Sequence, residues 1–503
     1  MASLKGKAIR AFMKWRSSKV AHFRTHAIQN QKDTLKLLLH KASNTFLGKK
    51  YEFGQIQSYA EFKEQLPIST YEDLKPYFER TLKGEQNVFW PEKITWFAKS
   101  GGTTSDRSKL IPVSQSTLNT AHYRGAFDVM SQYSLNRPQT RVFDGKTIII
   151  SGSYSKYENV RMVNCGDISA IMVANQPGLA DILRVPPKKI ALLPDFEKKI
   201  ALVAERCTRE KITGLAGVPT WNIVLMEKIL SHTGASDLSK IWPDMELYIH
   251  GGVNFEPFRN LFSEYLPLPQ MEYLQVYNAS EGFFAFQDVL ASDDMLLATN
   301  HGIVYEFIPL ANIHDKNPPT YCLEDIAIGV NYALVLTTNS GLWRYMIGDT
   351  IKFTSVEPYR IKVTGRVKFY INTFGEELSS EHTDLAIIEA SRKTGAWVGD
   401  YTVGPKYMQS GKKGAHEWYI EFKKQPEDIT QFIRILDLSL QKLNSDYEAK
   451  RYKNLAMELP IVHIATPQLF YKWFKIKNKM GAQAKVPKLS NDRIILDELM
   501  NLM

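Results

Sequence analysis

Between residues 146 and 282 the hydrophobic positions alternate between two patterns. Short apolar or β-branched runs predict strands, and amphipathic stretches between them predict helices. The expected strands are KTIII from Lys146, ITGLA from Ile212, MELYI from Met245 and MEYLQV from Met271, and the expected helices span 195–211, 220–234 and 256–266. Strands that alternate with helices predict an α/β fold whose largely parallel sheet is covered on both faces.

The flanking regions show different patterns. The first hundred residues read as mostly helical, with helices expected over 33–48 and 69–84; each ends at a glycine, and Ser69 or Thr70 would cap the second. Residues 302–371 read as hairpins and predict a smaller β subdomain. The last 130 residues contain strands near 416–422 and 460–467 and helices near 426–444 and 468–479, which is enough for a small α+β C-terminal domain.

Composition narrows the class of protein. The chain has 503 residues, of which 44% are hydrophobic and 23% charged, as in ordinary globular proteins with more than one domain. Its net charge of +10 is spread over 63 basic and 53 acidic residues, so no nucleic-acid partner is expected. Three widely spaced cysteines favour a reducing compartment, and we expect the cytoplasm.

The N-terminal 19 residues require a separate interpretation. Six basic residues alternate there with Ile9, Phe12, Met13 and Trp15, a pattern that fits a helix lying on a membrane surface or one packed on the main domain. The second interpretation is favoured. No stretch approaches the ~20 apolar residues of a membrane span, so no stable membrane association is expected.

The loop SGGTTSDRSK, from Ser100 to Lys109, is a candidate for phosphate binding. It matches neither a Walker loop nor a dinucleotide fingerprint. Its small residues would let backbone amides approach an anion, and Thr103, Thr104 and Ser105 supply hydroxyl donors. An ordinary turn between two strands remains the alternative.

Two further segments contain candidate chemistry. In YNASEG, Tyr277 could stack on a base or fill the core, and Glu281 could hold Mg²⁺ or be a solvated loop carboxylate. In WRYMIGD, Asp349 could accept the hydroxyls of a ribose or belong to a simple turn. The segment GRVK, from Gly365, follows with a guanidinium and an ammonium group.

The order of these motifs resembles that of the acyl-adenylate-forming superfamily. Within it the chain is most similar to the Gretchen Hagen family of acyl-acid amido synthetases, of a bacterial type. SGGTTSDRSK resembles its first signature, Tyr277–Glu281 its Tyr-x-x-Ser-Glu, and RYMIGD its Tyr-Arg-x-x-Gly-Asp. The opening helices and the ending GAQAKVPKLSNDR are also similar, so the resemblance covers nearly the whole chain.

The resemblance implies an ATP-dependent ligase. A carboxylic acid would attack ATP to give an acyl-adenylate and pyrophosphate, and the amine of an amino acid would then displace AMP. An acyl-CoA synthetase with a thiol acceptor is the nearest alternative; a non-catalytic basic protein that binds polyanions or membranes is another. A monomer is expected, with a domain over 1–366 that binds ATP and acid, a mobile domain over 367–503, and the hinge near Gly365–Lys368.

The resemblance also implies roles for individual residues. The catalytic residues would be Thr103, Glu281, Arg366 and Lys488, with Lys485 as a second candidate for the lysine beside the phosphates. Glu281 would bind Mg²⁺, and Asp349 would bind the ribose. The ATP-binding set would be Ser100, Gly102, Thr103, Thr104, Gly251, Gly252, Val253, Tyr277, Ser280, Glu281, Asp349 and Arg366, with Tyr277 stacked on the adenine.

The acyl pocket would lie between the loop after Gly217 and the helix after Ser114. Its expected lining is His122, Tyr123, Val218 and Trp221.

The chain departs from the family signature at two positions of the SGGTTSDRSK loop. Gly101 replaces a serine and removes a hydroxyl donor, and Asp106 replaces a glycine and puts a negative charge near the expected phosphates.

Overall fold

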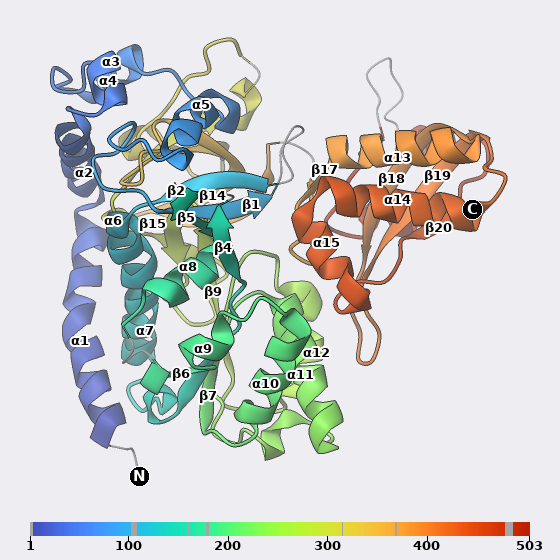
Figure 1. Cartoon of the computed structure of the whole chain (residues 1–503), viewed down its shortest axis with the longest axis horizontal. Helices are drawn as coiled ribbons and strands as arrows, with labels where there is room; N and C mark the ends of the chain where they lie inside the picture. Colours follow the sequence, from blue (N-terminus) through green and yellow to red (C-terminus); the bar gives the residue numbers. More distant parts are fainter. Residues whose placement is uncertain are drawn as a thin grey trace.

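The computed structural model describes residues 4–101, 108–157, 160–177, 181–313, 315–367, 370–477 and 486–503. The chain forms two lobes (Figure 1). Strand β15, which ends at Arg366, belongs to the larger lobe, and the smaller lobe, drawn in orange and red, contains the described elements from β16, the partner of β17, onwards. The mixed α/β class and the small C-terminal α+β unit are as predicted from the sequence.

A mixed sheet runs through the larger lobe and has eleven strands in the described residues. Its parallel half contains the strands predicted from the alternating pattern. In spatial order these are β9 (Glu272–Ala279), β8 (Leu247–His250), β7 (Ile212–Ala216), β3 (Lys146–Ile149) and the edge strand β6 (Arg184–Val185). The loops that follow β3, β7, β8 and β9 therefore meet at one edge of the sheet.

The hairpins expected over 302–371 extend this same sheet and do not form a sheet of their own. The link is β11, whose Met295 lies opposite Ile361 of β15. In spatial order the antiparallel strands are β12 (Ile303–Pro309), β13 (Asn331–Thr338), β14 (Tyr345–Val356), β15 (Tyr359–Arg366), β11 (Met295–Leu297) and β10 (Gly282–Phe286). Pairing between strands so far apart along the chain leaves no local mark in the sequence.

A second sheet, with four strands among the residues that the structure describes, contains the hairpin on either side of the SGGTTSDRSK loop. β1 pairs antiparallel with β2, with Ser100 opposite Lys109. In spatial order the strands are β2 (Ser108–Val113), β1 (Trp96–Gly101), β5 (Val160–Gly166) and β4 (Tyr154–Tyr157). Residues 102–107, which include Gly102, Thr103, Thr104 and Asp106, lie outside the described part of the chain.

Helices pack around these sheets. Those of the larger lobe are α1 (Leu4–Thr25), α2 (Ala27–Ala42), α3 (Phe46–Lys50), α4 (Tyr59–Gln65), α5 (Tyr71–Leu82), α6 (Gln115–Thr117), α7 (Arg124–Asn136), α8 (Ile168–Asn175), α9 (Lys188–Ala191), α10 (Phe196–Cys207), α11 (Pro219–Thr233) and α12 (Arg259–Tyr265).

The helix ends test the predicted caps. Thr70 is the N-cap of α5, as one of the two predicted residues, and Asp73 accepts a hydrogen bond from its backbone N–H at 2.8 Å. The helix expected over 33–48 instead ends at Ala42. Thr45 then caps α3 by accepting a hydrogen bond from the backbone N–H of Gly48, so this glycine lies inside a new helix.

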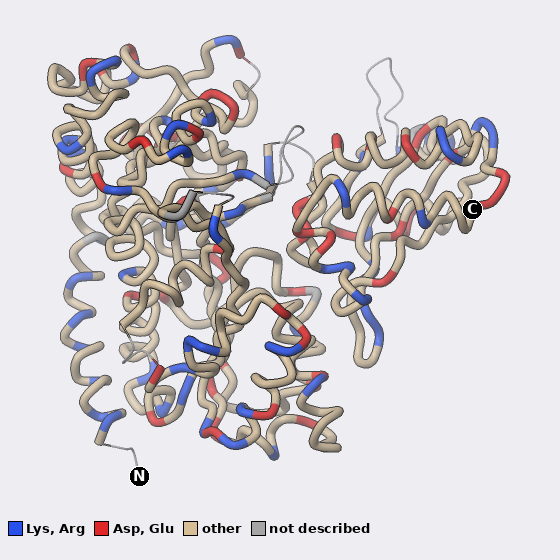
Figure 2. Tube along the Cα trace, in the orientation of Figure 1, with Lys and Arg blue, Asp and Glu red and all other residues tan. Residues whose placement is uncertain are grey.

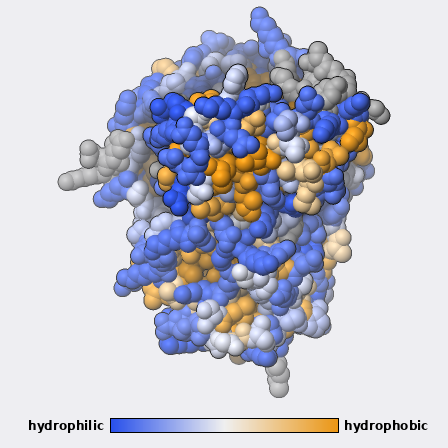
Figure 3. All heavy atoms as spheres, turned by 90° about the vertical axis from the view of Figure 1, so that its right-hand side faces the viewer, coloured by the Kyte–Doolittle hydropathy of each residue, from blue (hydrophilic) through white to orange (hydrophobic). Residues whose placement is uncertain are grey.

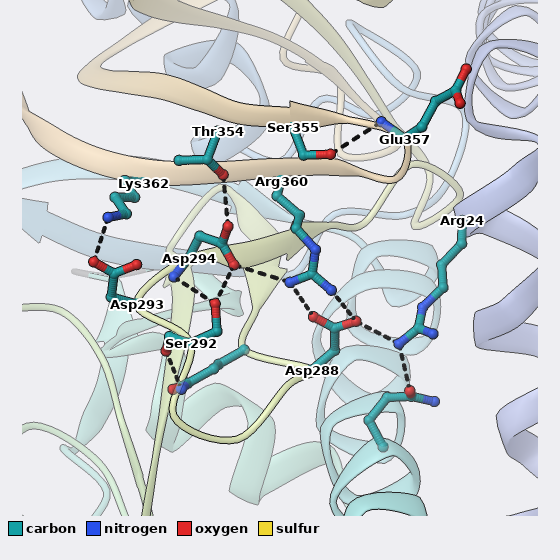
Figure 4. A network of polar contacts seen from close by, with 12 residues as sticks. Arg24, Asp288, Ser292, Asp293, Asp294, Thr354, Ser355, Glu357, Arg360 and Lys362 are labelled. Carbon is teal, nitrogen blue, oxygen red and sulfur yellow. Dashed lines mark hydrogen bonds and ion pairs between the residues drawn. The ribbon is translucent and has the colours of Figure 1, made fainter. Parts of the chain in front are cut away.

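The N-terminal helix α1 packs on the larger lobe, as favoured from the sequence. Met13 and Val20 of this helix are buried, whereas its Phe12 and Trp15 are exposed. At its end, Arg24 and Arg360 of β15 both bind Asp288, whose side chain is fully buried (Figure 4). This network ties the first helix to the central hairpins.

The smaller lobe is built on a three-stranded sheet with α13 and α14 side by side in front of it (Figure 1). Its strands are β16 (Tyr370–Ile371), β17 (Leu378–Ser379), β18 (Trp397–Lys406), β19 (Ala415–Lys424) and β20 (Ile461–Ile464), of which β16 and β17 pair separately. Its helices are α13 (Ser380–Thr394), α14 (Ile429–Leu443), α15 (Ser445–Arg451), α16 (Leu469–Ile476) and α17 (Ile494–Met500).

Part of the hydrophobic core runs across the boundary between the lobes. One hydrophobic cluster includes Phe258 of the larger lobe and Phe374 and Trp418 of the smaller lobe.

On the surface seen from the side of the smaller lobe, apolar side chains interrupt a mostly polar face (Figure 3). Lys, Arg, Asp and Glu are interspersed over both lobes (Figure 2). Among the described helices, none has the length and apolar character required to cross a bilayer.

Candidate active site

A cavity of about 2180 Å³ lies where the loops after β3, β7, β8 and β9 face the smaller lobe. Both lobes contribute to its walls. It is lined by every described residue of the expected ATP and acyl sites: Ser100, His122, Tyr123, Val218, Trp221, Gly251, Gly252, Val253, Tyr277, Ser280, Glu281, Asp349 and Arg366. The structure therefore brings together residues that are up to 266 positions apart in the sequence.

Tyr277, Asp349 and Arg366 form a polar cluster on the cavity wall. The Tyr277 hydroxyl donates to Asp349 Oδ2 at 2.7 Å, and Arg366 Nε lies 3.0 Å from Asp349 Oδ1. Asp349 and Arg366 are direct neighbours in the β14–β15 register. Burial and the adjacent Asp349 carboxylate raise the pKa of Tyr277, so its hydroxyl remains a donor at neutral pH.

The smaller lobe adds two residues to this cluster that the sequence did not single out. The Arg366 guanidinium lies 3.4 Å from Glu377 Oε2 and 4.6 Å above the centre of the Tyr370 ring. Burial lowers the pKa of Arg366, but the carboxylates of Asp349 and Glu377 outweigh that effect and raise it overall. Arg366 is thus a permanent positive charge at the junction of the lobes.

The double-glycine loop after β8 forms another part of the wall. Gly252 has a φ of +83°, which favours glycine, and a β-carbon at Gly251 would lie only 2.7 Å from the carbonyl oxygen of Val276. The Asn372 side-chain amide donates to the Gly252 carbonyl oxygen at 3.1 Å. The backbone of this loop is therefore exposed where a flat ligand could approach. Asn372 of the smaller lobe holds the loop in place.

Glu281 and Lys109 face one another on the side of the β1–β2 hairpin. Burial raises the pKa of Glu281 to about 7, although the positive charge of Lys109 acts in the opposite direction. Burial likewise lowers the pKa of Lys109. The Ser280 hydroxyl donates to the Lys99 carbonyl oxygen at 3.4 Å, which ties the Tyr-x-x-Ser-Glu segment to β1.

The surroundings of Glu281 bear on whether this site fits Mg²⁺. The described residues contain no group of three or more His, Cys, Asp or Glu side chains that could hold a metal ion by themselves. Mg²⁺ commonly uses one or two carboxylates together with substrate phosphates and water. One buried carboxylate beside a predicted phosphate loop fits that mode of binding.

The residues expected in the acyl pocket line the cavity. His122 and Tyr123 end a π-helical turn, Leu118–Tyr123, between α6 and α7; such turns are frequent at functional sites. Burial lowers the pKa of His122 to about 4, so its ring is neutral at pH 7. Trp221 packs on Phe196 with 4.5 Å between ring centres. These side chains are largely apolar, and the imidazole among them is neutral.

The predicted phosphate lysine lies elsewhere in this conformation. Lys488 Nζ is 2.7 Å from Asp384 Oδ1 and 4.4 Å above the centre of the Tyr401 ring, both within the smaller lobe. It does not line the cavity, although the next four residues do. Lys485 lies outside the described residues.

The sequence matches three domains of one family. Residues 16–271 match the GH3 family N-terminal domain, 296–366 the GH3 family central domain, and 381–494 the GH3 family C-terminal domain. The chain belongs to the GH3 family. The resemblance to the Gretchen Hagen family inferred from the sequence is therefore confirmed.

Curated members of the GH3 family are similar to this chain over most of their length. The indole-3-acetic acid-amido synthetase GH3.3 of Arabidopsis thaliana is 22% identical over 91% of this chain and 88% of its own. The jasmonoyl-L-amino acid synthetase GH3.5 of Oryza sativa subsp. japonica is 22% identical over 92% of both. The 4-substituted benzoates-glutamate ligase GH3.12 of A. thaliana is 21% identical over 85% of this chain and 87% of its own.

Solved structures share the fold. The GH3.15 acyl acid amido synthetase in complex with 2,4-DB has a TM-score of 0.62 and 17% identity, over 96% of this chain and 95% of that one. A 2-hydroxyisobutyryl-CoA ligase with 2-HIB-AMP and CoA has a TM-score of 0.59 and 12% identity, over 94% and 92%. The GH3 chain thus has the fold of adenylate-forming ligases.

Two buried basic residues that line the cavity of this GH3 chain, Lys199 and Arg184, were not predicted from the sequence. Lys199 donates to the carbonyl oxygens of Ser151 and Gly152 at 2.9 and 2.8 Å, and burial lowers its pKa to about 8. Arg184, on the edge strand β6, binds Asp181 at 2.6 Å. Both lie in segments whose local pattern resembles solvated surface, so no local signal distinguishes them.

Proposed function

We propose that this chain is an ATP-dependent acyl-acid amido synthetase that couples a carboxylic acid to the amine of an amino acid. The observation that carries the proposal is the Tyr277–Asp349–Arg366 cluster, which opens on the same cavity as Glu281 and Ser100. Amido synthetases and an amino acid ligase among the relatives support the same reaction.

In the first step the acid's carboxylate attacks the α-phosphorus of ATP, and the bond to pyrophosphate breaks. Asp349 accepts hydrogen bonds from the ribose hydroxyls, and Arg366 binds the ribose or the α-phosphate. The loop of Gly251, Gly252 and Val253 takes the adenine edge, and Tyr277 stacks on its face while its hydroxyl holds Asp349. Mg²⁺ on Glu281 would neutralise charge on the departing pyrophosphate.

The 100–104 loop would complete the phosphate site. Ser100, Gly102, Thr103 and Thr104 contribute backbone amides and hydroxyls, and Lys488 approaches the phosphates once the smaller lobe rotates. The acid occupies the pocket of His122, Tyr123, Val218 and Trp221. A neutral His122 can donate a hydrogen bond there without adding charge.

The proposal extends to the organisation of the whole chain. The smaller lobe, residues 367–503, moves between the two half-reactions about a hinge near Gly365–Lys368, and the larger unit is 1–366. The protein acts as a cytoplasmic monomer. Size-exclusion chromatography with light scattering tests the oligomeric state, and a dimer would contradict this part of the proposal.

Acid-dependent exchange of labelled pyrophosphate into ATP tests the first step. Indole-3-acetate, benzoate and 2-hydroxyisobutyrate are suitable first acids, followed by a wider panel. The Asp349→Asn variant should raise the KM for ATP at least tenfold, because one carboxylate oxygen that accepts from the ribose becomes a donor. The matched control Asp325→Asn alters an aspartate outside the cavity and should leave the KM within twofold.

Acceptor trials with amino acids and with CoA test the second step. Amide formation supports the proposal, and thioester formation would assign the chain to acyl-CoA synthetases instead. Salt-sensitive binding to polyanions without any pyrophosphate exchange would indicate a non-catalytic protein.

A further inference from the structure

Three charged side chains on α15 line the cavity from the smaller lobe, the exposed Glu448 and the pair formed by Asp446 and Lys450. Lys450 is 95% buried, and Asp446 is partly buried; both line the cavity. They are four residues apart on one helix, so they share a face. A buried ammonium is costly unless an anion binds it, which makes Lys450 an unexpected residue at this position.

The surroundings of Lys450 place it next to the expected acid. Its Nζ lies 4.2 Å above the centre of the Trp221 ring. Gly375, with a φ of +87°, passes so close that a β-carbon there would lie 3.3 Å from Nζ and 3.7 Å from Val218 Cγ1. A β-carbon at Gly252 would lie 3.4 Å from Val218 Cγ2. Lys450 therefore lies between the acyl pocket and the double-glycine loop, where an acyl-adenylate would have its reactive carbonyl.

The other carboxylates nearby already have donors. Glu376 accepts from His416 at 2.7 Å, Glu377 pairs with Arg366, and Asp167 accepts from the backbone N–H of Ser153 at 2.9 Å. Within the described residues, neither Lys450 nor the carboxylate of Asp446 takes part in a direct ion pair, and their mutual attraction acts at longer range. These two groups therefore remain available to a ligand.

We propose that Lys450 and Asp446 form the acceptor subsite, where the Lys450 ammonium binds the α-carboxylate of an amino acid and the Asp446 carboxylate binds its amino group. This assignment rests on the amido synthetase activity proposed above. A zwitterionic α-amino acid carries the two complementary charges on adjacent groups, whereas a simple amine lacks the carboxylate. The subsite thus selects α-amino acids.

Asp446 also acts as the base that deprotonates the ammonium group of the acceptor amino acid. Its carboxylate takes one proton from the acceptor ammonium, and the freed lone pair forms the C–N bond while the C–O bond to AMP breaks. The nitrogen then releases its second proton to solvent. Burial and the charges of Glu377, Asp167 and Glu376 raise the pKa of Asp446 to about 7, against the opposing effect of Lys450. A base with that pKa suits neutral pH.

A panel of amino acids first identifies the preferred acceptor. The first test then measures the unaltered protein and Lys450→Met with this acceptor in two forms, the amino acid and its α-amide, for example glycine and glycinamide. Pyrophosphate exchange should stay within twofold of the unaltered protein. The kcat/KM for the amino acid should fall at least thirtyfold, and that for the amide less than threefold. Lys393→Met is the matched control, because it removes a lysine of the smaller lobe that pairs with Glu389 outside the cavity.

The second test is the pH profile of Asp446→Asn. In the unaltered protein amide formation should rise with pH up to a plateau above about 7, and the variant should lose this limb while retaining pyrophosphate exchange. In the Lys450→Met test, equal losses of kcat/KM for the amino acid and for the amide would indicate a structural role of Lys450 and overturn the inference. Loss of pyrophosphate exchange in Lys450→Met, or an unchanged kcat/KM for the amino acid, would also overturn it.

The two proposals can fail separately. If the unaltered protein makes amides but Lys450→Met behaves as Lys393→Met does, only the acceptor subsite is wrong. If the unaltered protein forms no amide with any acid and amine, both proposals are overturned.

Discussion

At the scale of single residues, the carboxylates of the cavity differ by what surrounds them. Asp349 receives the Tyr277 hydroxyl and the Arg366 guanidinium, so it is held as an acceptor. Glu281 is buried with Lys109 as its compensating charge, and its pKa rises to about 7. The same side-chain chemistry therefore fits two roles, a fixed acceptor for hydroxyls and a ligand that requires a cation.

The pKa of Glu281 predicts how stability responds to pH. Since burial raises this pKa from the usual value near 4.5, the folded state favours the protonated form. The stability that this provides is present below pH 4.5 and is lost as the pH rises through 7. Glu281→Gln should therefore stabilise the protein at pH 8 by about 3 kcal/mol, since each pKa unit between about 4.5 and 7 corresponds to about 1.4 kcal/mol.

Denaturant unfolding at pH 8 and pH 5, without ATP or Mg²⁺, measures this difference. The gain should shrink at pH 5. The exposed Glu264→Gln should change the free energy of unfolding little at either pH. An equal effect of Glu281→Gln at both pH values would contradict the assignment of a raised pKa.

At the scale of elements, the β14–β15 hairpin does most to build the site. It sets Asp349 opposite Arg366 in register, and its pairing with β11 fixes the hairpin to the central sheet. The opposite end of β15 carries Arg360, which binds the buried Asp288 together with Arg24 of α1 (Figure 4). One hairpin thus joins the Tyr277–Asp349–Arg366 cluster to the N-terminal helix.

Removing Arg360 should destabilise the larger lobe. Arg360→Ala leaves the Asp288 carboxylate buried with Arg24 alone, so we expect a loss of about 3 kcal/mol in the free energy of unfolding. The control Arg209→Ala breaks the exposed pair with Glu205 and should cost less than about 1 kcal/mol. Urea denaturation followed by tryptophan fluorescence distinguishes the two, and equal losses would argue against a structural role for the network.

At the scale of the whole molecule, contacts between the lobes fix the observed arrangement. Lys453 Nζ lies 2.5 Å from Glu197 Oε2, Lys413 pairs with Glu227, and Asn372 binds the Gly252 carbonyl. The partly buried Lys488 faces away from the cavity in the same arrangement. A lysine needed at the phosphates would reach them only if the smaller lobe rotates.

A cross-link between the lobes tests that rotation. Cysteines replacing Glu197 and Lys453, joined by a cleavable bismaleimide in a Cys322→Ser background, should reduce multiple-turnover amide synthesis at least tenfold. One half-reaction should survive, and cleavage of the linker should restore turnover. Cysteines replacing Lys477 and Glu498, which pair within the smaller lobe, provide the control. Full turnover in the cross-linked protein would contradict a swinging lobe.

The sequence by itself determined the local elements and the chemistry of the motifs. Hydrophobic periodicity located β3, β7, β8, β9 and the helices between them, because a strand or helix records its buried face locally. Motif order singled out Tyr277, Glu281, Asp349 and Arg366, which line one cavity, and their roles stay predictions.

The tertiary structure alone decided which distant segments meet. The hairpins join the main sheet through β11, and Lys450 and Asp446 lie in the polar stretch NSDYEAKRYKN, which resembles a solvated helix. Burial of such groups depends on contacts with Trp221 and Gly375, more than 70 residues away along the chain. Pairing and burial between remote segments are set by packing, and no local pattern of residues encodes them.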